Sequence, residues 1–144
     1  MTKKVYLAIS DGFSDQDMFA ACARIQRENS GSIRVVARSL HPVKSQAGLK
    51  IIPDVDFIAS SDLVDIDSSN TAMVILPGGT QWKSKEIEFF KPLVRHCTEN
   101  QIAVLAMSEA ATWLAALEVI GRGNGHDYGV TTDNRILEMK ELLA

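Results

Sequence analysis

A serine stands at the centre of the segment Ala106-Met107-Ser108-Glu109-Ala110, directly after an apolar run. Small residues on both sides of a central side chain permit the sharp strand-to-helix turn called a nucleophile elbow, which exposes that side chain. Ser108 is therefore a candidate nucleophile for acyl transfer. A serine that follows a strand is also a common helix N-cap, and this alternative stays open.

Backbone amides near Ser108 are candidates for stabilising an oxyanion. Gly78 and Gly79 follow a second apolar run, and Glu109 starts the helix predicted after Ser108. Amides in tight loops and at helix starts attract negative charge, which is the chemistry an acyl-transfer intermediate needs. For Glu109, the alternative is an ordinary first-turn helix residue.

Two further side chains are candidates for acid–base roles. His126 is the only histidine after the elbow, and a serine nucleophile needs such a base. Because it lies in the polar loop Gly123–Asp127, an exposed histidine without a function is the alternative. Asp17 stands in the first turn of a predicted helix, where it either contacts the site or only complements the helix dipole.

The elements that must position these residues are indicated by apolar runs that alternate with helical spacing. Strands are predicted over residues 3–9, 33–40, 72–76 and 102–107, helices over 15–28, 84–98, 110–118 and 135–143, and loops over 41–48 and 53–70. Apolar strands joined by helices are typical of a parallel sheet covered on both faces. Such sheets bind ligands at the carboxyl ends of their strands, so we expect the site at the loops after Ile9, Leu76 and Met107.

Composition and charge narrow the class of protein. The chain has 144 residues, of which 46% are hydrophobic and 23% charged, and we expect one domain over residues 1–144. The net charge of −3 offers no basic excess for nucleic-acid binding. No apolar run approaches the ~18–20 residues of a membrane span, so neither an anchor nor a signal peptide is expected.

The two cysteines form no ligand cluster or disulfide pattern. We therefore expect no metal, no cofactor and a reducing, cytoplasmic location. Other residues are assigned by their spacing. Cys22, Cys97 and Trp113 are predicted to be core residues, Trp82 is predicted at a pocket mouth or subunit interface, and His41 and His96 are predicted to be exposed.

The segments Leu76–Gly79, Gly12–Asp17, Ala47–Lys50 before Pro53-Asp54, and the elbow together resemble the ThiJ/PfpI family. The resemblance covers about residues 3–120. That family belongs to the class I glutamine-amidotransferase-like proteins. It implies a three-layer, flavodoxin-like α/β sandwich with a mostly parallel central sheet. We expect this sheet to be shortened at the C-terminus, because relatives have more residues after the elbow.

The resemblance also implies a cysteine nucleophile in the elbow, an acidic partner on the first loop and often a nearby histidine. Ser108 best matches the cysteine, whereas an ungapped match from Ile102 places Ala106 there. Asp17 matches the acidic partner, usually a glutamate, and Glu109 stands where several relatives have histidine. In neither register is the cysteine present.

Two functions remain as hypotheses. The first is a divergent member with weak or no hydrolase activity that acts as a small-molecule-binding or regulatory homodimer. A homodimer would bury the edge of a shortened sheet, and relatives are typically dimers. The second is a serine-dependent hydrolase or amidase, similar to intracellular proteases, with Ser108 as nucleophile, His126 as base and Asp17 as the orienting acid. A redox or stress sensor acting through cysteine is a weaker third hypothesis.

Overall fold

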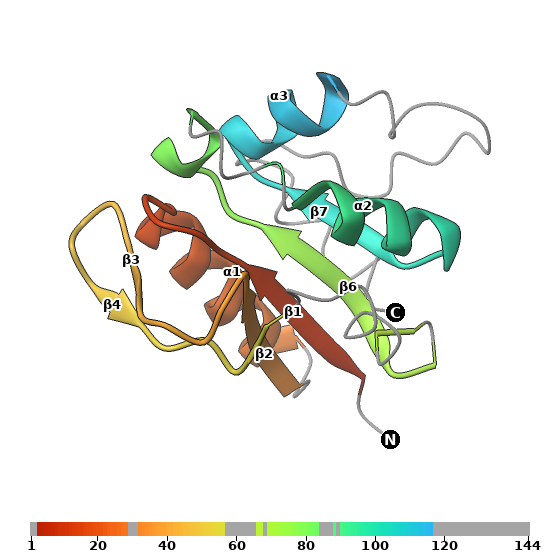
Figure 1. The fold of residues 1–144 in the computed structure, drawn as a ribbon. Coiled ribbons are helices and arrows are strands. Elements are labelled where there is room, and N and C mark those ends of the chain that lie inside the picture. Colours follow the sequence, from red (N-terminus) through yellow and green to blue (C-terminus); the bar gives the residue numbers. More distant parts are fainter. Residues whose placement is uncertain are drawn as a thin grey trace.

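The central element of the fold is a five-stranded parallel sheet, seen in a computed structural model that describes residues 3–28, 32–56, 66–67, 69–83, 88 and 90–116 (Figure 1). The strands lie in the order β5-β2-β1-β6-β7. Their bounds are Lys4–Ala8 for β1, Ser32–Ala37 for β2, Val55–Asp56 for β5, Thr71–Leu76 for β6 and Ala103–Ala106 for β7. All four pairings are parallel, so the carboxyl ends of these strands meet at one edge.

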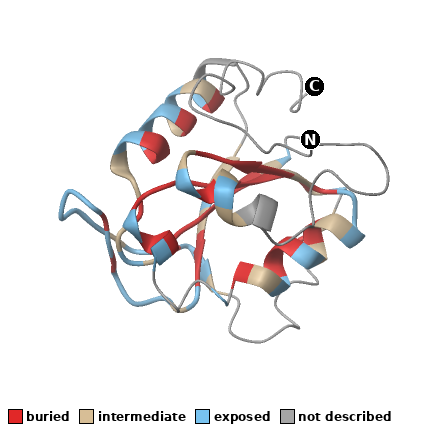
Figure 2. Cartoon of the chain, turned by 90° about the horizontal axis from the view of Figure 1, so that it is seen from above, coloured by how far each residue is buried: buried red, intermediate tan, exposed pale blue. Residues whose placement is uncertain are grey.

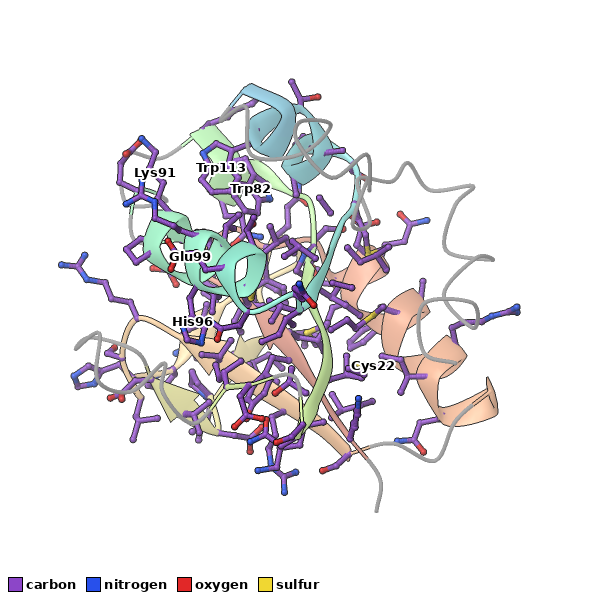
Figure 3. The ribbon with its side chains drawn as sticks, turned by 90° about the vertical axis from the view of Figure 1, so that its right-hand side faces the viewer. Cys22, Trp82, Lys91, His96, Glu99 and Trp113 are labelled. Carbon is purple, nitrogen blue, oxygen red and sulfur yellow. The ribbon has the colours of Figure 1, made fainter. Side chains whose placement is uncertain are left out.

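Helices cover the sheet on both faces. They are α1, Asp15–Glu28; the short 3-10 helix η2, Thr80–Lys83; α2, Phe90–Glu99; and α3, Glu109–Ala116. Because alternate residues of a strand point to opposite faces, Leu7 of β1 packs in one cluster with Ile25 of α1, whereas Ala8 packs in the other with Leu93 of α2. Figure 3 shows the sheet between α1 and α2. The predicted three-layer α/β fold with a parallel sheet is confirmed.

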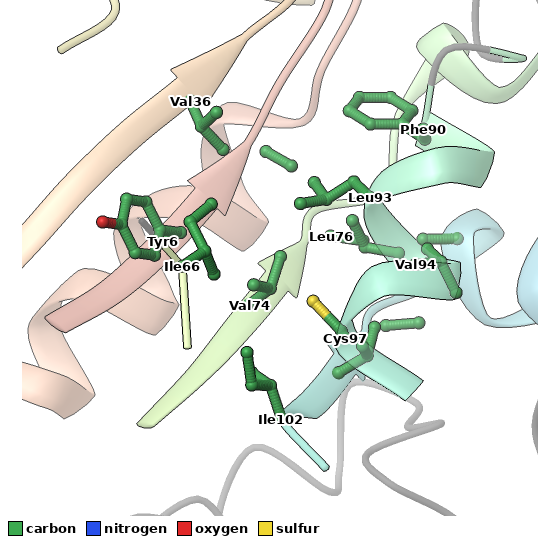
Figure 4. Close-up of a cluster of buried hydrophobic side chains, with 14 of the residues drawn as sticks. Tyr6, Val36, Ile66, Val74, Leu76, Phe90, Leu93, Val94, Cys97 and Ile102 are labelled. Atoms are coloured by element: carbon green, nitrogen blue, oxygen red, sulfur yellow. The ribbon is translucent and has the colours of Figure 1, made fainter. Parts of the chain in front are cut away.

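The cluster on the α2 face is shown in Figure 4, where Val74 and Leu76 of β6 meet Leu93, Val94 and Cys97 of α2. These residues are almost completely buried, and burial of such side chains is the main favourable term in folding. Figure 2 shows buried residues along the central strands, between helices that carry exposed residues on their outer faces. Helices α1 and α2 thus each contribute one apolar stripe to the core.

Helix α1 begins where the sequence predicts it. Ser14 is its N-cap, since the Ser14 hydroxyl oxygen accepts a hydrogen bond from the Asp17 amide at 3.2 Å. Asp15 and Asp17 lie in the first turn, where the helix dipole favours a negative charge. This start places Asp17 directly after the loop that leaves β1.

Several element boundaries differ from those predicted. The strand predicted over residues 33–40 ends at Ala37, and the strand predicted over 102–107 spans only Ala103–Ala106. Helix α2 begins at Phe90, and residues 84–87 and 89 of its predicted range lie outside the described residues. The predicted helix over 135–143 also lies outside them.

The loop predicted over residues 53–70 is corrected at Val55–Asp56, which form β5 and pair with the end of β2. Asp54 fixes this pairing, because its amide donates to the Val35 carbonyl oxygen and its carboxylate accepts from the Val35 amide, both at 2.8 Å. A strand of two residues has no alternation for a sequence pattern to reveal. The turn-rich segment before it contains a small antiparallel hairpin, β3 (Val43–Lys44) and β4 (Lys50–Ile51).

The prediction that Trp82 lies at a pocket mouth or subunit interface is wrong, because Trp82 lies in the core. Only 9% of its surface is exposed, and its indole nitrogen donates to the Pro77 carbonyl oxygen at 2.7 Å. Its ring centroid lies 4.7 Å from that of Trp113 and 5.1 Å from that of Phe90. The partly buried Trp113 packs against the same core cluster.

The prediction that His96 is exposed is wrong. His96 is half-buried, and its Nε2 lies 2.7 Å from the Ile66 carbonyl oxygen. His41 is exposed, as predicted. Cys97 is buried, whereas Cys22 is only partly buried against the core on the α1 face. Among the described helices, none is both long and apolar enough to cross a membrane.

Candidate functional site

The turn between β7 and α3 is centred on Ser108. Strand β7 ends at Ala106 and α3 begins at Glu109, and Ser108 has a φ of +50°. A non-glycine residue in this left-handed region is strained, and such strain is concentrated at functional turns. Ala106 is instead a buried strand residue. Of the two registers that the sequence left open, the one through Ser108 has the geometry of an elbow.

Gly78 is the point at which four predicted site residues meet. A Cβ atom on Gly78 would lie 2.5 Å from Glu109 Oε1, 2.7 Å from Ser108 Cβ and 2.8 Å from Asp17 Oδ2. Real Cβ atoms essentially never approach other heavy atoms this closely. Only a glycine leaves room for the elbow, the first turn of α1 and the loop after β6 to come together.

The backbone amides of this loop donate to side chains of the chain itself. The Gly78 amide donates to Asp17 Oδ2 at 2.9 Å in a buried hydrogen bond, and the Gly79 amide donates to Glu109 Oε1 at 3.0 Å. These amides are the donors that the sequence suggests for an oxyanion. In this structure, both amides already donate to a carboxyl oxygen.

Gln81 holds the same loop in place and was not singled out by the sequence. Its side chain is fully buried, and its Oε1 accepts from the Ser10 amide at 2.8 Å and from the Ser10 hydroxyl at 3.1 Å. Its Nε2 donates to the carbonyl oxygens of Pro77, at 2.7 Å, and Gly78, at 3.3 Å. One amide side chain thus ties the loop after β1 to the loop after β6. No motif marks it, because its role depends on two loops that are distant in the sequence.

The β3–β4 hairpin forms another wall of the site. The Gln46 amide donates to the Phe13 carbonyl oxygen at 2.8 Å, and the Ala47 amide donates to Asp15 Oδ1 at 2.8 Å. Burial raises the pKa of Asp15, but hydrogen bonds from the Ser45 side chain and the Ala47 amide outweigh this effect, so the pKa lies below its usual value. The ionised Asp15 therefore anchors the hairpin to the start of α1.

A surface pocket of about 380 Å³ opens between these segments. Its wall includes the two carboxylates of Asp17 and Glu109, the side chains of Gln16 and Gln46, and the loop residues Gly79 and Ser108. This volume falls at the lower end of the range for small-molecule sites. The pocket lies at the carboxyl ends of the strands, where open parallel sheets bind ligands.

The remaining candidate groups lie elsewhere. His126, the predicted base, lies outside the described residues. Burial raises the pKa of the Cys97 thiol to about 12 and also raises the pKa of Cys22. Neither cysteine lines the pocket, and a thiol with a raised pKa is a poor nucleophile. Across the described residues, no three His, Cys, Asp or Glu side chains are grouped to hold a metal ion.

Solved structures with the same fold come from several organisms. A DJ-1 superfamily protein of Agrobacterium tumefaciens matches with a TM-score of 0.69 and 22% identity, over 82% of this chain and 60% of that chain. Drosophila melanogaster DJ-1beta matches with a TM-score of 0.59 and 21% identity, over 80% of this chain and 60% of that chain. A two-domain protein of Anabaena variabilis, with DJ-1/ThiJ/PfpI-like and ferritin-like domains, matches with a TM-score of 0.64 and 19% identity, over 85% of this chain and 34% of that chain.

The matched region of this chain is thus about 60% of the length of the Agrobacterium and Drosophila proteins. A search of the curated proteins finds no significant match. The model of the DJ-1/PfpI family matches residues 3–131, which is most of the sequence and includes the elbow and the Gly78-Gly79 loop. The chain therefore belongs to the DJ-1/PfpI family.

Proposed function

We propose that this chain binds a small molecule in the pocket beside Ser108 and has little or no hydrolase activity. The main support is that the Gly78 and Gly79 amides donate to the carboxylates of Asp17 and Glu109. An oxyanion hole works through donors that are already directed at the place where negative charge develops. Here a reacting carbonyl would have to displace two hydrogen bonds to carboxyl oxygens and bring its new negative charge beside two acidic side chains.

The side chains around Ser108 also give little help to a nucleophilic serine. A serine hydroxyl needs a nearby base to become reactive, and histidine is the usual one. Among the described residues of the pocket wall there is no histidine, lysine or arginine. Binding without acyl transfer is the function that this wall supports best.

A serine-dependent hydrolase or amidase is the second candidate. It is favoured by the positive φ of Ser108 at a strand-to-helix turn, since a strained turn of this kind is how an elbow exposes its nucleophile. In that mechanism, Ser108 attacks a carbonyl, His126 accepts its proton and Asp17 orients the base. It also requires the loop amides to exchange their carboxylate partners for the substrate oxygen.

The proposal includes a homodimer in the cytoplasm. The dimer is carried over from the family resemblance, and it is supported by the short edge strand β5, where Val55 and the neighbouring Leu40 are exposed. The cytoplasm rests on the absence of a disulfide or metal pattern in the cysteine spacing. A regulatory role would follow if ligand binding altered the dimer.

The binding proposal is tested by filling the pocket. Ala20 is exposed on α1 and lines the pocket, so Ala20→Trp places an indole in the space for a ligand without touching the core. Fragments of about 10–20 heavy atoms are screened by the NMR shifts of the Gly79, Ser108 and Glu109 amides, and the hits are titrated. Ala20→Trp is expected to weaken the hits at least about tenfold, because it excludes the ligand from the cavity.

The matched control is Ala23→Trp, an exposed position on the same helix that does not line the pocket. The affinities of this variant for the fragment hits should stay within about twofold of those of the wild type, since surface substitutions away from a site have little effect. A screen without any shift at the three pocket amides, or equal affinities for both tryptophan variants, would contradict binding at this site.

A further inference from the structure

The wall of the pocket beside Ser108 holds the carboxyl groups of Asp17 and Glu109 and, among its described residues, no lysine, arginine or histidine. Asp17 is 8% exposed, Glu109 is exposed, and both line the pocket. Their oxygens Oδ2 and Oε1 lie within 2.8 Å and 2.5 Å of the same point beside Gly78. Two carboxylates that share a site repel each other, and a cation near both relieves this repulsion.

The Gly78-Gly79 loop would otherwise favour a ligand of the opposite charge. Successive backbone amides in a tight loop form a concavity that attracts phosphate or carboxylate groups. In this chain, the concavity is filled by the carboxylates of Asp17 and Glu109. A site that contains its own anions disfavours a second anion.

The polar groups around the carboxylates suit a donor-rich ligand. The oxygens of both carboxyl groups are hydrogen-bond acceptors, and each group accepts one bond from a loop amide. Gln16 and Gln46 add side-chain amide oxygens to the same wall. An ammonium group carries three N–H donors and a guanidinium five, with no acceptor in either.

We infer that the ligand of this pocket carries a positive charge, as an amine or a guanidine, and that carboxylates and phosphates are excluded. The inference rests on the proposed function, because it names the chemical class of ligand for the same pocket. Asp17 and Glu109 are the residues that select it. Ser108, Gln16 and Gln46 supply neutral polar contacts around the cation.

The test compares molecules of the same shape and different charge. N-acetylargininamide carries a guanidinium where N-acetylcitrullinamide has a neutral urea. Benzylamine, benzyl alcohol and benzoate share one aromatic ring and carry a positive, a neutral and a negative group, respectively. Each is titrated into the full chain while the pocket amides are followed by NMR. We expect each cation to bind roughly tenfold tighter than its neutral counterpart, and benzoate not to bind, because hydrogen bonds to charged groups are the stronger ones.

Glu109→Gln supplies the matched variant. It removes one charge and keeps an oxygen to accept from the Gly79 amide, so the loop retains its hydrogen bond. The preference for the cation should fall to about threefold or less in this variant, because one of the two acidic side chains is gone. Asp17→Asn makes the same change at Gly78, and the two variants should agree in direction.

Different outcomes separate this inference from the proposed function. Equal or tighter binding of benzyl alcohol or benzoate at the pocket overturns the charge selection and leaves small-molecule binding in place. An unchanged cation preference in both Glu109→Gln and Asp17→Asn also overturns it. If no molecule of either set shifts the pocket amides, the inference fails, and the Ala20→Trp experiment with fragment hits decides on small-molecule binding.

Discussion

Gln81→Leu is expected to lower the free energy of unfolding by about 3 kcal/mol, because it leaves buried polar groups without partners. The Ser10 amide and hydroxyl both depend on Gln81 Oε1 as acceptor. The carbonyl oxygens of Pro77 and Gly78 keep other donors, Trp82 Nε1 and the Ser14 amide, so most of the loss arises at Ser10. Urea unfolding of the two proteins measures the difference.

Gln16→Leu is the matched control, since it makes the same chemical change at an exposed glutamine of α1. Its effect should stay within about 0.5 kcal/mol, as is usual for surface positions. A loss below about 1 kcal/mol for Gln81→Leu would mean that water or a rearranged loop replaces the glutamine amide. The account of Gln81 as the tie between the two loops would then be wrong.

Gly79→Ala is expected to cost about 4 kcal/mol, from two sources. Gly79 has a φ of +107°, a conformation that strains any residue with a Cβ. The new Cβ would also lie 2.6 Å from the Ser14 amide nitrogen and 2.9 Å from the Phe13 carbonyl carbon, and still closer to the Gly12 carbonyl oxygen. These are backbone atoms, so no side-chain rotation relieves the overlap. Thermal and urea unfolding measure the loss.

Gly48→Ala separates the two sources. Gly48 has a similar φ of +95°, but a Cβ there would have no heavy atom within 4 Å beyond its chain neighbours. We therefore expect only the conformational strain, about 1–2 kcal/mol. Equal losses for the two alanine variants would show that the loops after β1 and β6 separate easily, which contradicts the close packing on which the site depends.

The fold and family were predictable because they depend on local patterns. Three of the five strands of the described sheet, β1, β6 and β7, are almost continuous apolar runs, as is typical of strands buried on both faces. Strand β2 ends in the apolar residues Val35, Val36 and Ala37. The start of α1 follows from Ser14 and its acidic first turn. Strand β5 was missed, because two residues held by the contacts of Asp54 leave no periodic signal.

The location of the site was predictable, and its hydrogen bonds were not. Parallel strands bring their carboxyl ends together, so the loops that carry Asp17, Gly78 and Ser108 had to be neighbours. The sequence suggested free loop amides, whereas the structure directs them at Asp17 and Glu109. The acceptors of these two amides depend on the directions of the Asp17 and Glu109 side chains in the folded chain, which the sequence does not reveal. The same is true of Gln81, whose partners lie 71 and 4 positions away in the sequence.

Labelling with a fluorophosphonate, read by intact mass, tests most directly the claim that Ser108 is not an activated nucleophile. A fluorophosphonate modifies a serine only when a base and oxyanion donors activate it. The folded wild type and Ser108→Ala are incubated side by side, with a known serine hydrolase as the positive control. We predict no mass increase in either protein, because the loop amides are occupied by carboxylates. A single adduct on the wild type that is absent from Ser108→Ala would contradict the account and establish the hydrolase.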